Sequence, residues 1–203
     1  MPRVLILGTS HVYWMDNYIK DNPQNTRFNL NHVGGEVRTH IFGIRGGRVN
    51  KVTHCREWEA AIVRTRPIHL IVQFGSNDID THRMNEDALD QVQQKISLLL
   101  NTWRTRYHLR HITFCQVMPR LRTRHFQSAN DYNLMAKQLT IRMEVLHETD
   151  PSFSVCFFRG IPWLSPPPFL FYKPSTDGVH LSSLGNKSYY RNIRGAIIRM
   201  LRH

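Results

Sequence analysis

Acidic residues, cysteines and long apolar runs are all scarce in this sequence. Its 203 residues include 15 Asp and Glu against 27 Lys and Arg, which gives a formal net charge of +12. Three cysteines in a chain of this size exclude a small disulfide-stapled scaffold. No apolar run approaches the ~20 residues that a membrane-spanning helix needs. With 41% hydrophobic and 21% charged residues, the chain is neither disordered nor fibrous. We therefore expect one soluble, basic domain over residues 1–203.

The cysteines and the N-terminus both indicate a reducing compartment. Cys55, Cys115 and Cys156 include no close pair, and two of them lie inside apolar runs. This pattern is typical of buried, reduced thiols, and it predicts an intracellular protein, cytoplasmic or nuclear. The apolar run from Val4 to Leu7 is too short for the core of a signal peptide and leads directly into Gly8. We interpret it as the first strand of the domain, without a signal peptide.

Short apolar runs alternate with helical patterns along the whole chain. Four of these runs lack polar alternation, which is typical of strands that are covered on both faces. A fifth run, Val37–Phe42, alternates as an edge strand does. The four continuous runs are Arg3–Leu7, Ile68–Phe74, His111–Met118 and Phe153–Phe158.

Helical periodicity fills the segments between these runs. Apolar residues recur at spacings of three and four, as they do on one face of a helix. Strands that alternate with helices predict a parallel sheet between two helical layers, with functional groups at the carboxyl ends of the strands. The helical faces are Leu89, Val92, Ile96, Leu99 and Trp103; Tyr132, Met135, Leu139, Met143 and Leu146; and Ile193, Ile197 and Leu201, with weaker helices near 11–20 and 50–64.

Short polar motifs fall where the strands of such a sheet end, or just before the last helix. They do not match the G-x-G-x-x-G dinucleotide fingerprint, and the G-x-x-x-x-G-K-[ST] phosphate loop is absent. The motifs are Gly8-Thr9-Ser10, Gly43-Ile44-Arg45-Gly46-Gly47, Gly75-Ser76-Asn77-Asp78 and Asp177-Gly178-Val179-His180.

Each motif taken alone has an ordinary structural explanation. Ser10 suits a helix cap, Asn77 suits a turn, and the Asp177–His180 pair suits the surface ahead of the last helix. The combination is more specific, because it supplies a nucleophilic hydroxyl, further oxyanion donors and a histidine that an aspartate three residues earlier can orient. A parallel sheet would bring Ser10 and His180 to the same edge.

The four motifs, in this order, resemble the four blocks of the SGNH (GDSL-type) hydrolase superfamily over nearly the whole chain. The resemblance implies a flavodoxin-like three-layer α/β/α sandwich with a five-stranded parallel sheet, and ester hydrolysis without a metal or other cofactor. It implies Ser10 as the nucleophile, His180 as the general base and Asp177 as the residue that orients His180. The oxyanion hole would comprise the N–H groups of Ser10 and Gly46 and the side chain of Asn77.

One position departs from the superfamily pattern, whose first block usually reads Gly-Asp-Ser. Thr9 stands in place of the aspartate, and His11 adds a titratable group next to Ser10. The departure bears on activity rather than on fold. The phrases Val117-Met118-Pro119-Arg120 and Asp177-Gly178-Val179-His180-Leu181-Ser182 narrow the resemblance to SGNH-type domains in retrotransposon open reading frames of animals. That narrower resemblance implies that the chain is one piece of a larger protein.

The substrate is poorly determined by the sequence. Trp163 and Phe169 lie in a proline-rich stretch before the last motif, and together with His11 they are candidates for contacts with an acyl group. The same aromatic residues equally suit a plug that fixes this stretch to the core. We expect a small-molecule ester with a short acyl chain or a lipid. No side chain dictates the acyl length, and nothing indicates an oligomeric state.

The positive charge is concentrated in residues 92–130, which contain six arginines, Lys95 and no acidic residue. Arg120, Arg122 and Arg124 form a candidate patch for an anion or for nucleic acid. A solvated basic loop and direct contact with an acidic substrate are the alternatives. The rival function is therefore a basic module that binds nucleic acid or an anionic surface on a catalytically weak or inactive scaffold. No zinc-finger spacing or RNA-binding aromatic motif occurs, and we expect no metal site.

Overall fold

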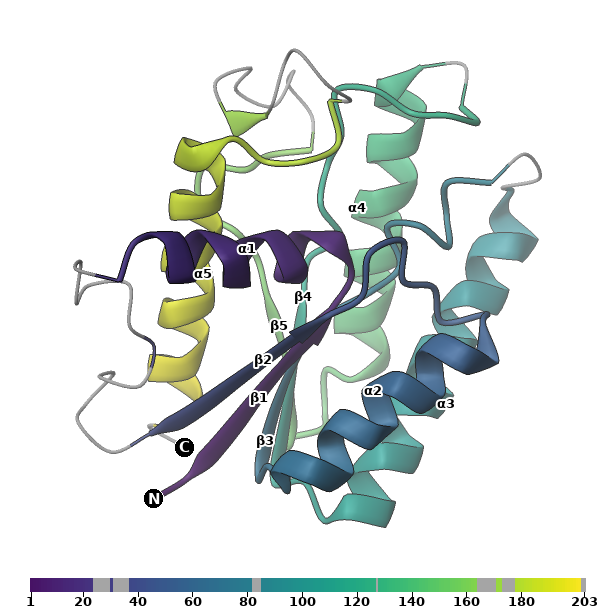
Figure 1. The fold of residues 1–203 in the computed structure, drawn as a ribbon. Helices are drawn as coiled ribbons and strands as arrows, with labels where there is room; N and C mark the ends of the chain where they lie inside the picture. The colour runs from purple at the N-terminus through teal and green to yellow at the C-terminus, as the bar shows by residue number, and fades with distance from the viewer. Residues whose placement is uncertain are drawn as a thin grey trace.

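A five-stranded, fully parallel sheet lies at the centre of the molecule, with the strand order β2-β1-β3-β4-β5 (Figure 1). The computed structural model describes residues 1–23, 30, 37–81, 85–126, 128–163, 171–172 and 178–201. The strands are β1 (Arg3–Gly8), β2 (Arg38–Gly43), β3 (His69–Gln73), β4 (His111–Cys115) and β5 (Phe153–Cys156). The helices are α1 (Ser10–Asp21), α2 (Val52–Thr65), α3 (Glu86–Tyr107), α4 (Ala129–Leu146) and α5 (Ser183–Met200). Over the residues described, each helix is too short or too polar to cross a membrane.

Helices cover both faces of the sheet, which confirms the predicted α/β/α architecture. Successive strand residues point to opposite faces, so Leu5 and Leu7 pack toward α2, α3 and α4, while Val4 and Ile6 pack toward α1 and α5. The four side chains are almost completely buried. Figure 1 shows α1 and α5 on one side of the sheet and α2 and α3 on the other.

The predicted strands are correct in number and order, and β2 is an edge strand as expected. Three of them are shorter than predicted: β3 lacks one residue at each end, and β4 and β5 are shorter because Gln116 ends their pairing. Its backbone N–H makes the last contact of the ladder, donating to Cys156 O at 3.0 Å. Beyond it, the Gln116 side chain accepts from Phe158 N at 2.7 Å and donates to Ile161 O at 2.9 Å. The apolar residues after each strand therefore belong to loops, in which Val117, Met118 and Phe158 are buried and Phe157 is exposed.

The predicted helical faces pack against the core, where Leu99, Met135 and Leu201 are only partly buried, and Leu146 is the one exception. Leu146 is 52% exposed, because it is the last residue of α4 and lies beyond the part of the helix that covers the sheet. Cys115 and Cys156 are buried at paired positions of β4 and β5, as predicted, whereas Cys55 is only half-buried on α2.

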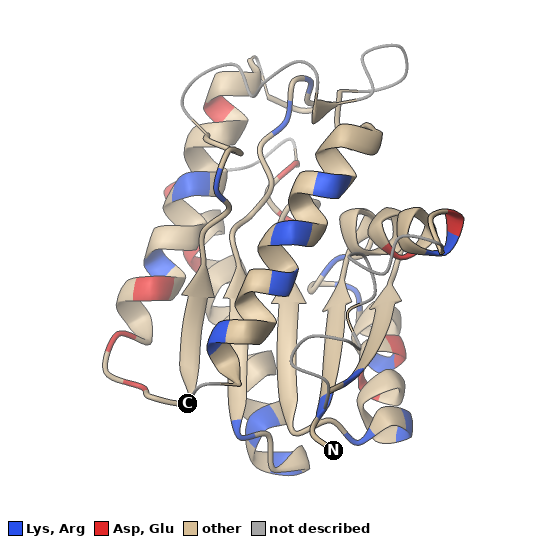
Figure 2. Ribbon diagram, turned by 90° about the vertical axis from the view of Figure 1, so that its left-hand side faces the viewer, with Lys and Arg blue, Asp and Glu red and all other residues tan. Residues whose placement is uncertain are grey.

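A row of basic side chains follows the outer side of α5, where Figure 2 shows no acidic residue on the helix. Lys187, Arg191 and Arg194 are spaced by four and three residues, which places them on one helical face. The surplus of positive charge is therefore not confined to residues 92–130.

Candidate active site

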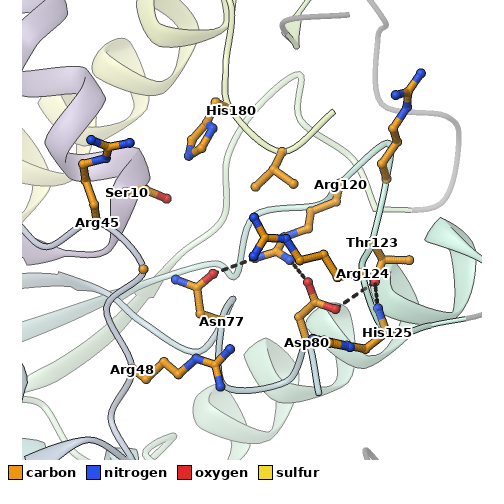
Figure 3. Close-up of a pocket in the computed structure, with 13 residues that line it drawn as sticks. Ser10, Arg45, Arg48, Asn77, Asp80, Arg120, Thr123, Arg124, His125 and His180 are labelled. Atoms are coloured by element: carbon orange, nitrogen blue, oxygen red, sulfur yellow. Dashed lines mark hydrogen bonds and ion pairs between the residues drawn. The ribbon is translucent and has the colours of Figure 1, made fainter. Parts of the chain in front are cut away.

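The carboxyl ends of the central strands open onto a pocket of about 470 Å³ (Figure 3). The loops that follow β1, β2, β3 and β4 form its walls, together with the segment just before α5. The pocket therefore lies at the edge of the sheet where the sequence predicted a site. Its lining residues are Ser10, Arg45, Gly46, Arg48, Asn77, Asp80, Arg120, Arg122, Thr123, Arg124, His125, Val179 and His180.

Ser10 is the first residue of α1, and Thr9 holds the N-cap position. The alternative interpretation of Ser10 as a helix cap is therefore wrong. Ser10 is 6% exposed, and its hydroxyl makes no hydrogen bond with any other residue in the described part of the chain. The first N–H groups of a helix lack partners inside the helix, so the Ser10 N–H can donate to an anion in the pocket.

Two glycines let α1 begin close to the sheet. A Cβ on Gly8 would lie 2.3 Å from Cγ2 of Val12, and a Cβ on Gly43 would lie 2.2 Å from the backbone N of Tyr13. Real Cβ atoms do not approach other atoms so closely, so a side chain at either position would displace the first turn of α1. The glycines of the first two motifs thus determine where Ser10 stands.

Thr9, the residue that departs from the superfamily pattern, is completely buried. Its hydroxyl donates to Oε1 of Gln73 at 3.0 Å and lies 3.5 Å from Oγ of Ser76. Gln73 is the last residue of β3, so this contact joins the ends of β1 and β3. The residue before Ser10 is therefore fixed to the end of β3 by a buried hydrogen bond between two uncharged side chains.

Asn77 lies on a tight turn after β3, in which Gly75 adopts a φ of +94° and its carbonyl accepts from Asp78 N at 3.0 Å. The Asn77 amide is held from both ends. Its Oδ1 accepts from Nη2 of Arg120 at 2.9 Å, and its Nδ2 donates to Gly47 O at 3.1 Å. A guanidinium can only donate, so this contact fixes which end of the amide faces Arg120. The second N–H of Nδ2 remains for a ligand.

Gly46 has a φ of +66°, in the left-handed region that favours glycine, although a Cβ would meet nothing within 4 Å there. Gly47 is buried, and its N–H donates to Ile44 O at 3.1 Å. No such bond is made by the Gly46 N–H to another described residue. Gly46 lines the pocket and its N–H is left for a ligand, whereas the N–H of Gly47 is already used.

His180 lines the same pocket as Ser10, and Figure 3 shows the two side chains on neighbouring walls. Its ring lies edge-on to Trp14, with 5.9 Å between the ring centroids. The segment that carries His180 is tied down on two sides, by Leu121 N donating to Gly178 O at 2.8 Å and by His11 Nε2 bonding Val179 O at 3.1 Å. Asp177, the predicted partner of His180, lies outside the described residues.

Two of the predicted substrate contacts, His11 and Trp163, do not line this pocket. His11 is 1% exposed and lies behind the pocket, where its ring centroid is 6.4 Å from that of His180. Trp163 donates from Nε1 to Val117 O at 2.9 Å and packs against the core, so of the two open interpretations it is a plug. Phe169 lies outside the described residues.

Arg120 does not belong to a surface patch, which corrects the prediction. It is 3% exposed, and its guanidinium lies 4.6 Å from the ring centroid of Tyr132. It forms a buried ion pair with Asp80 and donates to Ser76 O at 3.0 Å. Sequence alone does not distinguish this buried arginine from its neighbours Arg122 and Arg124, which are exposed and line the pocket.

Six further residues of the pocket wall were not predicted from the sequence. They could have been found only in part, since Arg45 and Val179 lie inside the second and fourth motifs, whereas the others carry no motif signal. They are Arg45, Arg48, Asp80, Thr123, His125 and Val179. Over the described part of the chain, no three His, Cys, Asp or Glu side chains are grouped so that they could hold a metal ion.

Comparisons with known proteins place this architecture in a class of hydrolase folds. No protein-family model matches the sequence, and no curated protein matches it significantly. Solved structures do match. A GDSL-like lipase from Bacteroides thetaiotaomicron gives a TM-score of 0.68 at 15% identity, over 98% of this chain and 88% of that chain. A lipase/acylhydrolase from Enterococcus faecalis gives 0.62 at 11% identity, over 98% and 97%. A catalytic mutant of an acetylxylan esterase from Geobacillus stearothermophilus gives 0.55 at 13% identity, over 95% and 92%.

The fold of this chain is thus the three-layer fold of GDSL-like lipases and acylhydrolases. It is the SGNH hydrolase fold that the four sequence motifs predicted.

Proposed function

We propose that the chain is a serine ester hydrolase of the SGNH type that acts on a small-molecule ester. Ser10 is the nucleophile, His180 is the general base, and Asp177 orients His180. The observation that carries the proposal is that Ser10, Gly46, Asn77 and His180, from four separate segments of the sequence, line one pocket.

The mechanism follows from the groups that face this pocket. His180 takes the Ser10 proton as Oγ attacks the ester carbonyl, and the N–H groups of Ser10, Gly46 and Asn77 donate to the tetrahedral oxyanion. His180 then protonates the leaving alcohol, and an acyl-enzyme remains. Water repeats the cycle on the acyl-enzyme and releases the carboxylic acid. A pocket of about 470 Å³ is within the usual size range of sites for small molecules.

The test is hydrolysis of a short-chain 4-nitrophenyl ester. Ser10→Ala should lower kcat by several orders of magnitude, and Asn77→Ala by about 10²–10³-fold, as is typical for one oxyanion donor. Ser183→Ala is the matched control, because Ser183 is also the first residue of a helix and is exposed away from the pocket. Equal rates for the wild type and Ser10→Ala would contradict the proposal.

A second function, binding of nucleic acid, is favoured by one observation only. Lys187, Arg191 and Arg194 form a basic row on the outer face of α5, separate from the pocket residues. Such a row attracts phosphate backbones without reading sequence. An origin in a retrotransposon open reading frame stays a prediction from the sequence resemblance.

A further inference from the structure

Cationic side chains dominate the wall of the candidate active site. Five arginines line the pocket, and Asp80 is its one acidic residue within the described part of the chain. Asp80 is already satisfied, because it pairs with the buried Arg120 and accepts from Oγ1 of Thr123 at 2.8 Å. The charge of Arg120 is therefore cancelled inside the wall. Four guanidinium groups remain, those of Arg45, Arg48, Arg122 and Arg124.

These four arginines have no acidic partner of their own. None forms an ion pair with a carboxylate over the ranges that the structure describes. They come from two separate loops, since Arg45 and Arg48 follow β2 and Arg122 and Arg124 follow β4. Figure 3 shows Arg45 beside Ser10, and Arg124 on the side of Asp80 and Thr123.

Arg45 is held next to the nucleophile by aromatic rings. Its guanidinium carbon lies 5.7 Å from the ring centroid of Trp14 and 6.0 Å from that of Tyr13, both on the first turns of α1. Such contacts stabilise a cation without neutralising it. The positive end of the α1 dipole, at Ser10, adds to the same field.

Four like charges around one small pocket repel each other, so this arrangement of side chains costs free energy. A bound anion would offset that cost, and a concave wall of one sign raises the local concentration of anions. Arginine also presents paired N–H donors that match the two oxygens of a carboxylate or phosphate.

We propose that the substrate is an anionic ester, in which the acyl or the alcohol part carries a carboxylate, phosphate or phosphonate group that these arginines hold. The inference rests on the proposed function and names its substrate class. Hydrolysis itself is unchanged, because water converts the ester to an acid and an alcohol and the anionic group stays on its own fragment. The small pocket favours such a molecule over a polymer with many phosphates.

Binding is measured first, on the Ser10→Ala chain, so that it does not depend on catalysis. Two pairs of ligands separate the acyl side from the alcohol side. One pair is the 4-nitrophenyl monoester of adipic acid and its neutral methyl ester, and the other is the acetate of 4-hydroxybenzylphosphonate and its neutral dimethyl ester. In at least one pair, the anionic ligand should bind about tenfold or more tightly, since a charge-assisted hydrogen bond is worth about that factor.

The arginines are then replaced in the same Ser10→Ala background. The double substitution Arg45→Gln with Arg124→Gln should remove most of the preference for the anionic ligand. Arg56→Gln is the matched control, because Arg56 is exposed on α2 and does not line the pocket, and it should leave the preference unchanged. Equal affinity for both members of each pair, or a preference that survives the double substitution, would overturn the inference.

Hydrolysis of the same four esters by the wild type separates this inference from the proposed function. Ser10-dependent hydrolysis with no preference for the anionic esters would support the proposed esterase activity and overturn the inference of an anionic substrate. If the anionic esters bound in a way that depends on the arginines but were not hydrolysed, the proposed esterase activity would be overturned. Only the anion-binding site formed by the arginines would then be supported. A random-sequence oligonucleotide is the last ligand to test. If it bound more tightly than either anionic ester and lost affinity in the same double variant, the ligand of the arginines would be nucleic acid and not a small ester.

Discussion

At the scale of single residues, the contact between Arg120 and Asn77 decides which end of the Asn77 amide the proposed oxyanion hole would contain. An isolated Asn amide can present either end to a pocket. Here Arg120 holds the oxygen end, and Gly47 O accepts one of the two N–H groups at the other. The ion pair between Arg120 and Asp80 fixes the guanidinium in turn. Arg120 is thus a positioning residue for the proposed reaction, because it acts through its contact with Asn77.

Replacement of Arg120 by lysine keeps the charge beside Asp80 and removes the planar fork that also reaches Asn77. We expect Arg120→Lys to lower kcat for a neutral ester by about tenfold or more, a part of the ~10²–10³ that one oxyanion donor contributes, with a smaller change in KM. The substitution should have no further effect on kcat in an Asn77→Ala background, which a double-mutant cycle measures. An equal loss in both backgrounds would show that Arg120 acts elsewhere.

Asp78 gives the fold a pH dependence of its own. Burial raises the pKa of Asp78 from its usual 3.8 to about 6, although backbone N–H groups of Asn50 and Val49 donate to it. The folded chain therefore holds this proton more tightly than the unfolded chain does. The resulting stabilisation is complete below pH 3.8 and is lost as the pH rises through about 6.

The variant Asp78→Asn is neutral at every pH and should lose this dependence. Between pH 4 and pH 7, its free energy of unfolding should rise relative to that of the wild type by about 2–3 kcal/mol. Urea denaturation of both proteins across this range measures the difference. A constant difference between the two curves would refute the assigned role of Asp78.

At the scale of elements, the features that the sequence predicted correctly are those that hydrophobic periodicity controls. The five strands, their parallel arrangement and the long helices follow from the spacing of apolar residues, and all are present. Periodicity does not record where a strand stops pairing, so the loop residues after Cys115 and Cys156 were predicted as strand. It also does not tell a buried arginine from an exposed one, which is why Arg120 was placed with Arg122.

The start of α1 is the element boundary on which the site depends most. Gly43→Ala would force a Cβ into the backbone of Tyr13, 2.2 Å away. We expect a loss of about 1–3 kcal/mol in unfolding free energy, typical of overpacking, and a fall in esterase kcat as Ser10 moves. Chemical denaturation and steady-state kinetics measure the two effects.

Gly195→Ala is the matched control for that substitution. Gly195 lies within α5, and the nearest atom to its added Cβ is a flexible arginine nitrogen at 3.6 Å. Alanine should therefore stabilise the chain by about 0.5–1 kcal/mol and leave kcat unchanged. If both substitutions had the same effect, the close approach at Gly43 would not be what places Ser10.

At the scale of the whole molecule, the net charge of +12 includes two groups of basic side chains that lie apart from each other. Part of it lines the pocket, and part follows the outer face of α5. Composition indicated an affinity for anions but could not separate a substrate from a polyanion, because both need the same side chains. The folded arrangement makes the two functions testable with different substitutions.

Replacement of Lys187, Arg191 and Arg194 by glutamine should weaken the binding of nucleic acid and leave ester hydrolysis unchanged. For a random single strand, the plot of log affinity against log salt should lose about 0.7 of slope per contact removed, or about 2 in total. Fluorescence anisotropy at several salt concentrations measures the slope. An unchanged slope would remove α5 as a nucleic-acid surface.

The central claim is that His180 activates Ser10, and a fluorophosphonate probe tests it most directly. Intact-protein and peptide mass spectrometry after exposure to the probe should find one adduct, on Ser10. The adduct should be absent from Ser10→Ala and strongly reduced in His180→Ala, while Ser183→Ala should label as the wild type does. No adduct on Ser10, or an equal amount in His180→Ala, would contradict the account.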